Sequence, residues 1–178
     1  KSIRGSDPDA SIYYFARLVD GGADVQMIGR RLLVIASEDI GMAYPSAISI
    51  THACVSAALM VGFPEAAINL AEAVIMLASS PKSNSSIKAY YKAMSDIKHK
   101  DTDMVPDHLR DSHYKGARDK GLGKDYKYPH DFGGYVKQQY LPDNLHAEGV
   151  RYYEPSENGS EANFKRFLEE LRKKYGDN

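Results

Sequence analysis

Two adjacent carboxylates in the stretch SEDIGMAYP, residues 37–45, are the first side chains whose chemistry needs an explanation. Glu38 and Asp39 stand at the predicted end of a helix, shortly before a glycine and a proline. Paired carboxylates can serve acid–base catalysis or bind a metal ion. Negative charges in the last turn of a helix, however, face the negative end of its macrodipole, so a compensating partner is expected.

That partner must come from outside the helix, because its own arginines lie about two turns before the carboxylates. Backbone N–H groups after Pro45, or a basic side chain such as Lys82 or Arg110, are the candidates. We therefore favour a structural role, in which the carboxylates fasten a corner between two helices, over a catalytic one. The predicted structural corner consists of Glu38, Asp39, Gly41 and Pro45.

Histidines and aspartates further along the chain suggest a metal site as a second kind of chemistry. His108 and His113 lie five residues apart, and His130 stands next to an aspartate. A spacing of five does not place two histidines on one helix face, so we favour aspartates that cap turns and histidines that pack or face solvent. The single cysteine, Cys54, lies in an apolar run and is expected to be buried. We predict no catalytic residue and no bound metal.

A phosphate-binding loop is the third possibility, in the stretch GARDKGLGK at residues 116–124. Gly116 and Gly121 have the separation of a P-loop, but Leu122 and Gly123 occupy the positions that require Lys and Ser or Thr. The groups that would contact phosphates and magnesium are therefore missing. We predict no cofactor in this chain.

Residues 113–130 interleave basic side chains with tyrosines. Cations for phosphates and rings for base stacking are what single-strand binding requires. The alternative, which we favour from the residues alone, is a solvated loop whose tyrosines pack inward. The candidate DNA or partner surface consists of Lys115, Arg118, Lys120, Lys124, Tyr126, Lys127 and Tyr128.

The composition excludes some broad classes of protein. The formal net charge is −1 with 26% charged residues, so no global field favours nucleic acid or a membrane surface. The longest apolar stretch, residues 53–63, is shorter than the ~20 residues that span a bilayer. A single cysteine favours a reducing, cytoplasmic location. The opening KSIRGSDPDA has no signal pattern, and we expect the numbering to begin inside a longer protein.

Helical spacing and capping residues predict the elements that position these side chains. Helices are expected after Asp7-Pro8, Asp24, Pro45, Pro64 and the Ser83-Asn84 pair. The third and fourth are apolar nearly all round and are therefore expected to be central. Strand-like alternation is confined to a few residues within 133–142 and 150–155.

We predict a mostly α-helical fold with one domain over residues 1–178. Residues 1–98 form a helical core, residues 99–160 form an irregular Tyr-, Gly- and Pro-rich segment, and residues 161–178 hold a terminal amphipathic helix. The irregular segment is expected to pack on the helices through its tyrosines and Leu141, because a long structureless stretch is uncommon in a compact domain.

Several ordered motifs together resemble the C-terminal region of the RarA/MgsA family of AAA+ ATPases, akin to the Werner-helicase-interacting protein. They are KSIRGSDPDASIYYFARLVDGGAD, IASEDIG-x-A-x-P, PEAAINLAEAVIMLASSPKSN, VPDHLRD, GKDYKYPHD and QQYLPD, and they cover essentially the whole chain. The chain departs from the family pattern at Tyr44, where a capping aspartate is expected. That departure leaves the cap of the third helix in doubt.

The resemblance implies a helical domain like a clamp-loader collar, through which subunits assemble into a homotetramer. It implies that ATP and Mg bind in an ATPase domain that precedes this chain, so that this fragment is not itself an enzyme. The full-length protein would act on DNA at replication forks in the cytoplasm, associated with the nucleoid. Its partners would be its own copies, DNA, and replication proteins such as single-strand-binding protein, with no membrane. A DNA-binding module at residues 113–130 is the alternative function.

Overall fold

A computed structural model describes residues 1–112 and 121–176, and these ranges contain helices and connecting segments without a β-strand. The predicted mostly helical fold is confirmed. The chain forms two compact units, the first of Lys1–Ala89 with Tyr153–Lys165 and the second of Tyr90–Tyr152 with Arg166–Asn178. The arrangement as a single domain stays a prediction.

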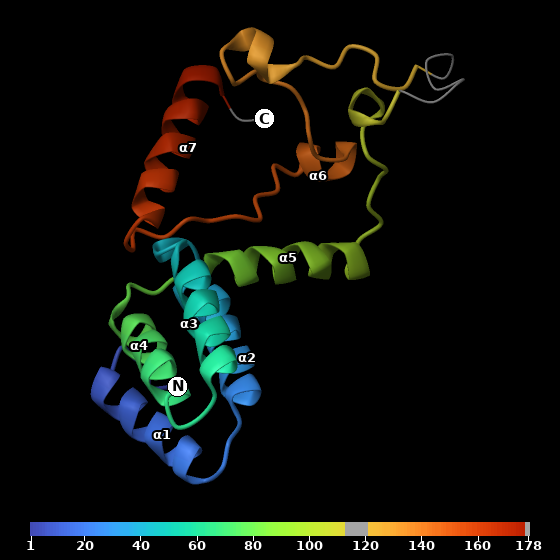
Figure 1. Ribbon diagram of the computed structural model, residues 1–178. Helices are drawn as coiled ribbons and strands as arrows, with labels where there is room; N and C mark the ends of the chain where they lie inside the picture. Colours follow the sequence, from blue (N-terminus) through green and yellow to red (C-terminus); the bar gives the residue numbers. More distant parts are fainter. Residues whose placement is uncertain (113–120, 177–178) are drawn as a thin grey trace. The chain divides into compact units, whose positions relative to one another are not determined.

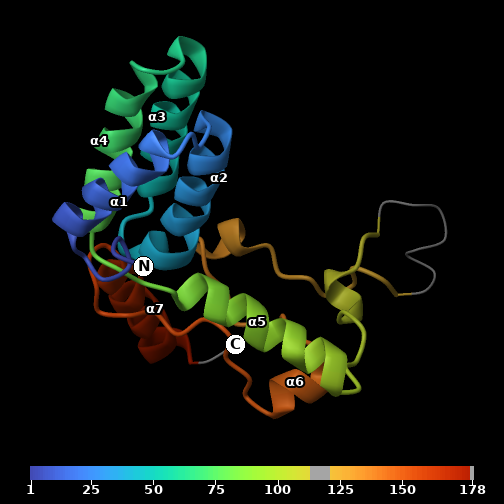
Figure 2. The same cartoon turned by 90° about the horizontal axis from the view of Figure 1, so that it is seen from below.

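Four helices form most of the first unit: α1 (Pro8–Asp20), α2 (Val25–Ile35), α3 (Ala47–Val61) and α4 (Ala66–Ser79). Helix α4 packs against α3 and α1, and α2 packs against α3. Figures 1 and 2 show these four helices, coloured blue to green, lying side by side. The core between them is rich in small residues, with Ile40, Leu70 and Leu77 as its largest fully buried apolar side chains.

The first two helices begin where their capping residues predict. The Ala10 N–H donates to Asp7 Oδ1 at 2.8 Å, and the Met27 N–H donates to Asp24 Oδ1 at 2.6 Å. Helix α3 begins at Ala47, two residues after the predicted proline, because that proline lies in a turn closed by a hydrogen bond from the Ala47 N–H to the Tyr44 carbonyl. Ser46, at the N-cap, makes no side-chain capping bond.

The prediction that α3 and α4 are central holds for only part of their surfaces. Cys54 is buried as predicted, and burial raises the pKa of its thiol. Gly29 of α2 lets α3 approach closely, since a Cβ there would lie 2.5 Å from Val55 Cγ1. Met60 and Ile68, however, are 88% and 72% exposed. Apolar residues on every side therefore do not mean complete burial here.

Helices α5 (Ser85–His99) and α7 (Glu161–Tyr175) each begin in the first unit and end in the second. Between them lie short helical turns at Asp107–Leu109 and Pro129–Phe132, and the five-residue helix α6 (Asp143–Ala147). Helix α7 begins at the predicted residue. The stretches 133–142 and 150–155 form no strand, which corrects the suggested alternation.

Tyrosines of the irregular stretch in the second unit contact helices, and the Tyr135 ring lies 4.6 Å from the Tyr175 ring of α7, centroid to centroid. The Tyr152 hydroxyl donates to Asp96 Oδ2 of α5 at 2.9 Å. Leu122 and Leu145 are buried, whereas Leu141 is only half-buried. Over the part of the chain that the structure describes, no helix is both long enough and apolar enough to cross a membrane.

Candidate functional site

The carboxylate pair lies at an irregular corner between α2 and α3. Helix α2 runs into a π-helical turn, Ala36–Ile40, which is followed by a 3₁₀ turn, Gly41–Ala43. Such turns are frequent at functional sites, so the contacts of the two acids decide their role. Asp39 is buried, whereas the side chain of Glu38 is 40% exposed.

The partner of both acids is Arg4, from the N-terminal segment. Arg4 Nε donates to Asp39 Oδ1 at 2.5 Å, and Arg4 Nη2 donates to Glu38 Oε1 at 3.3 Å. The hydrogen bond from Arg4 to Asp39 raises the pKa of the guanidinium. A turn closed by the Gly5 N–H to the Lys1 carbonyl, with Ile3 buried beneath it, positions this arginine. Arg4 is not among the partners that the sequence suggests, and Arg110 forms an ion pair with Asp107 instead.

The segment between α4 and α5 also joins the corner. The Ser83 N–H donates to the Asp39 carbonyl at 2.9 Å. Gly41 has a φ of +48°, and a Cβ there would lie 2.8 Å from the Ser83 carbonyl oxygen, so this approach requires glycine. Lys82 lines a pocket together with Arg4 and the two acids. Its ammonium nevertheless donates to the Ala78 and Ser80 carbonyls near the end of α4, and burial lowers the pKa of Lys82.

A third segment reaches the corner from just before α7. The Ser160 N–H donates to the Ala43 carbonyl at 2.8 Å. Gly159 has a φ of +54°, and a Cβ there would overlap the Ala43 carbonyl oxygen and the Pro81 ring. Segments from the beginning, middle and end of the first unit's sequence thus meet at one corner. These contacts support the structural interpretation of the corner.

Beside the corner lies a buried carboxylate that no sequence motif marks. Glu161, the first residue of α7, has no exposed surface. It accepts hydrogen bonds from the hydroxyls of Ser85, Tyr153 at 2.8 Å and Ser156 at 2.6 Å. Burial acts to raise the pKa of Glu161, but the hydroxyl donors outweigh it and hold the pKa below 4.5. Burial, aided by Glu161, raises the pKa of Tyr153 to about 12.

Replacing both corner acids with alanine, in a Glu38→Ala/Asp39→Ala variant, is expected to lower the melting temperature by about 2–4 °C. Arg4 would then lose both carboxylates, although its solvent exposure limits the cost. Thermal unfolding followed by circular dichroism measures the change. An Asp9→Ala/Asp20→Ala variant in α1 keeps the same change in charge and is the control. Unchanged melting of the corner variant would contradict the structural role.

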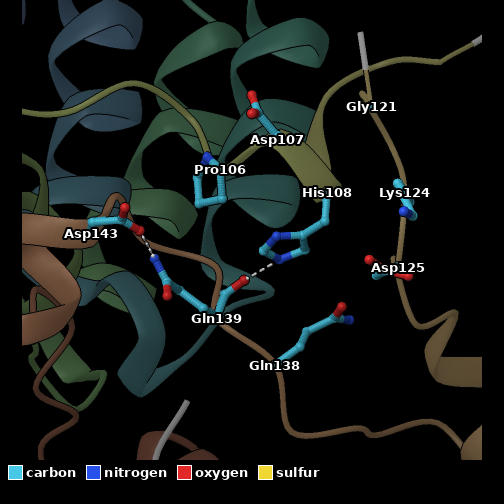
Figure 3. Close-up of a pocket in the computed structure, with 9 residues that line it drawn as sticks. All are labelled: Pro106, Asp107, His108, Gly121, Lys124, Asp125, Gln138, Gln139 and Asp143. Carbon is cyan, nitrogen blue, oxygen red and sulfur yellow. Dashed lines mark hydrogen bonds between the residues drawn. The ribbon is translucent and has the colours of Figure 1, made fainter. Parts of the chain in front are cut away.

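The second unit holds a polar pocket, drawn in Figure 3. The His108 ring donates through Nε2 to the Gln139 carbonyl at 2.8 Å, and Gln139 Nε2 donates to Asp143 Oδ1 at 2.6 Å. Lys124 and Asp125 lie on the opposite side of the pocket in Figure 3. Three aspartates and one lysine line the pocket, so its charge does not favour a phosphate.

The histidines of the possible metal site do not come together where the structure describes them. The Nε2 of His108 carries a proton for its bond to a carbonyl and is unavailable as a ligand, and His130 lies 5.0 Å from the Tyr128 ring, centroid to centroid. His113 lies outside the described residues. Within residues 1–112 and 121–176, no group of three or more His, Cys, Asp or Glu side chains could hold a metal ion.

The candidate DNA or partner surface is described only in its second half. Lys115, Arg118 and Lys120 lie outside the described residues. Lys124 and Lys127 are exposed, and the rings of Tyr126 and Tyr128 are 45% and 53% exposed. The two tyrosines therefore do not pack inward, contrary to the interpretation favoured from the residues alone.

The described residues form a helical structure whose buried polar contacts join distant segments, and the family match assigns it to the C-terminal regions of AAA+ ATPases. The chain belongs to the family "MgsA AAA+ ATPase C terminal", whose family model matches residues 5–172. The resemblance indicated by the sequence motifs is confirmed.

Named relatives agree with this family. The chain is 51% identical to "Replication-associated recombination protein A" of Bacillus subtilis over 98% of its own length and 41% of the relative. It is 37% identical to the Escherichia coli K12 protein of the same name, over 90% of this chain and 36% of the relative. It is 37% identical to "ATPase WRNIP1" of Dictyostelium discoideum, over 83% of this chain and 17% of the relative. The chain therefore spans about two fifths or less of these relatives.

Proposed function

We propose that this chain is the C-terminal assembly domain of a RarA-type AAA+ ATPase and that it holds four copies of the protein together. The family membership supports a role within such an ATPase. The observation that carries the assembly role is an exposed apolar surface at the end of the α3–α4 hairpin. This apolar tip consists of Leu59, Met60, Val61, Phe63 and Ile68.

The apolar tip has the character of a contact between chains. Met60 and Ile68 are 88% and 72% exposed, and the other three side chains are 39% to 55% exposed. Contiguous exposed apolar side chains mark interaction surfaces, since burying them gains roughly 25 cal/mol per Å². Large apolar interfaces are typical of obligate homo-oligomers. A second copy of this chain is the partner that we propose for the tip.

In this proposal the remaining activities belong to the whole protein. ATP and Mg bind in an ATPase domain outside this chain, and this chain performs no catalysis itself. The assembled protein acts on DNA during replication-associated recombination, in the cytoplasm and at the nucleoid. Single-strand-binding protein is a candidate partner. The names of the relatives, "Replication-associated recombination protein A" and "ATPase WRNIP1", support this assignment.

The assembly role predicts the solution mass of the chain. Light scattering over a dilution series is expected to give four times the 19.8 kDa chain mass at every concentration. A Met60→Glu/Ile68→Glu variant is expected to shift the mass toward the monomer, because charges would be buried in an apolar contact. Ile97→Glu, at a position on α5 that is 63% exposed, is the control and should leave the mass unchanged. A monomeric wild-type chain would contradict the proposal.

A further inference from the structure

Two exposed tyrosines in the second unit lie on a backbone that a single side chain holds in place. The Lys127 N–H donates to Gln138 Oε1 at 3.2 Å, and Gln138 Nε2 donates to the Lys127 carbonyl at 2.8 Å. The Gln138 amide thus pairs with both backbone groups of one residue, as a neighbouring strand would. Gln138 Nε2 also donates to the Tyr140 hydroxyl at 2.9 Å, which orients the amide.

Lys127, whose backbone pairs with Gln138, lies between Tyr126 and Tyr128. Tyr126 and Tyr128 are 45% and 53% exposed on either side of it, and the backbone of Tyr128 is extended. Because the Gln138 amide forms hydrogen bonds with both backbone groups of Lys127, the backbone between the two rings is held in place before a ligand binds. An ordered display lowers the entropic cost of binding.

We propose that Tyr126 and Tyr128 form a stacking surface for the bases of single-stranded nucleic acid. From residue 124 to residue 131 the sequence is KDYKYPHD, which has rings and charges but no aliphatic side chain apart from proline. A surface for an apolar protein partner would instead require aliphatic anchors and pockets. Flat, exposed rings suit the faces of bases, which stack with little dependence on sequence.

Charge determines how such binding depends on salt. Lys124 and Lys127 are exposed, and neither ammonium group forms an ion pair with a described residue. Asp125 and Asp131 balance their charge within the same stretch, so stacking and not charge supplies most of the affinity. Two phosphate contacts predict a salt exponent near −1.4 on single strands, which is an affinity loss of about sevenfold between 50 and 200 mM salt.

Fluorescence anisotropy with a labelled oligo(dT) of about 20 nucleotides tests the surface on the 178-residue chain. A Tyr126→Ala/Tyr128→Ala variant is expected to bind at least about 25-fold more weakly, because each stacked base contributes at least roughly fivefold. A Tyr126→Phe/Tyr128→Phe variant keeps the rings and should bind like the wild type. Tyr13→Ala/Tyr14→Ala removes two similarly exposed tyrosines from α1 and should also leave binding unchanged.

Three outcomes would overturn the proposal. They are a wild-type chain that does not bind oligo(dT), an alanine variant that binds as well as the wild type, and a phenylalanine variant as weak as the alanine variant. Selective binding of a protein, with no binding of the oligonucleotide, falls under the first outcome. The solution mass measured by light scattering should stay the same in all these variants. Failure of the stacking surface is therefore distinguishable from failure of the assembly role.

Discussion

Replacing Glu161 with alanine is expected to lower the free energy of unfolding by about 3 kcal/mol. The carboxylate is completely buried and accepts hydrogen bonds from three hydroxyls, those of Ser85, Tyr153 and Ser156. Its removal leaves the buried Ser85 hydroxyl and two half-buried hydroxyls without this acceptor, and each unsatisfied buried donor costs about 1–3 kcal/mol. Urea denaturation at neutral pH measures the loss.

The control for this variant is Glu169→Ala, which changes an exposed acid on the same helix and should alter stability by less than about 0.5 kcal/mol. Glu161→Gln keeps the size of the side chain and most of its acceptor capacity, but it loses the charge and buries an amide donor. It should therefore fall between the wild type and the alanine variant. A Glu161→Ala chain that unfolds at the wild-type urea concentration would contradict the role that we assign to this residue.

The pH dependence of stability tests the stabilising role of Glu161 independently. Its pKa in the folded state lies below the ordinary value of 4.5, because the hydroxyl donors outweigh burial. The ionised carboxylate therefore stabilises the fold at every pH above 4.5, and this contribution is lost as the pH falls through the lower, folded-state pKa. The difference in stability between the wild type and Glu161→Gln should narrow in that acidic range.

Sequence patterns predict the features of this fold that depend on neighbours in the chain. The caps at Asp7 and Asp24 and the beginning of α7 follow from residues within one helical turn. The predicted beginnings at Pro45 and Pro64 are each two residues early, because each proline lies in the turn before its helix. Local rules identify each helix, but they do not identify the turn that precedes its first residue.

The contacts of the corner show where prediction from sequence stops. The need for a partner at Asp39 follows from the helix macrodipole, but Arg4 lies 35 residues away and no local spacing selects it over Lys82. Glu161 contacts Ser85 across 76 residues. In the sequence, that acid looks like a first-turn glutamate of an exposed helix. Only the packing of distant segments against α7 buries this carboxylate and supplies its hydrogen-bond donors.

The exposure of apolar side chains is equally difficult to predict from the sequence. Apolar residues on all sides of α3 and α4 predict burial, yet part of their apolar surface is exposed, and the assembly proposed above would cover it. Met60 at 88% exposure follows the same pattern as Leu70, which is fully buried on the neighbouring helix. Periodicity distinguishes apolar from polar faces, but it does not distinguish contacts within a chain from contacts between chains.

Replacing Gly159 with alanine is expected to destabilise the first unit by about 3 kcal/mol. Two costs combine at this position. The φ of +54° is unfavourable for a residue with a Cβ, by roughly 1–2 kcal/mol. The added Cβ would also overlap the Ala43 carbonyl oxygen, which accepts the Ser160 N–H at 2.8 Å and ties the segment before α7 to the corner.

Gly22→Ala separates the two costs. Gly22 belongs to the same unit and has a φ of +82°, but a Cβ there would meet no atom within 4 Å. The Gly22→Ala variant should therefore incur only the backbone cost. Gly159→Ala incurs that cost and also loses the contact with the corner. Hydrogen exchange adds a local measurement, since the Ser160 amide should exchange faster in Gly159→Ala and at the wild-type rate in Gly22→Ala. If the two variants lost equal stability and protected Ser160 equally, the segment before α7 would not depend on close approach to the corner.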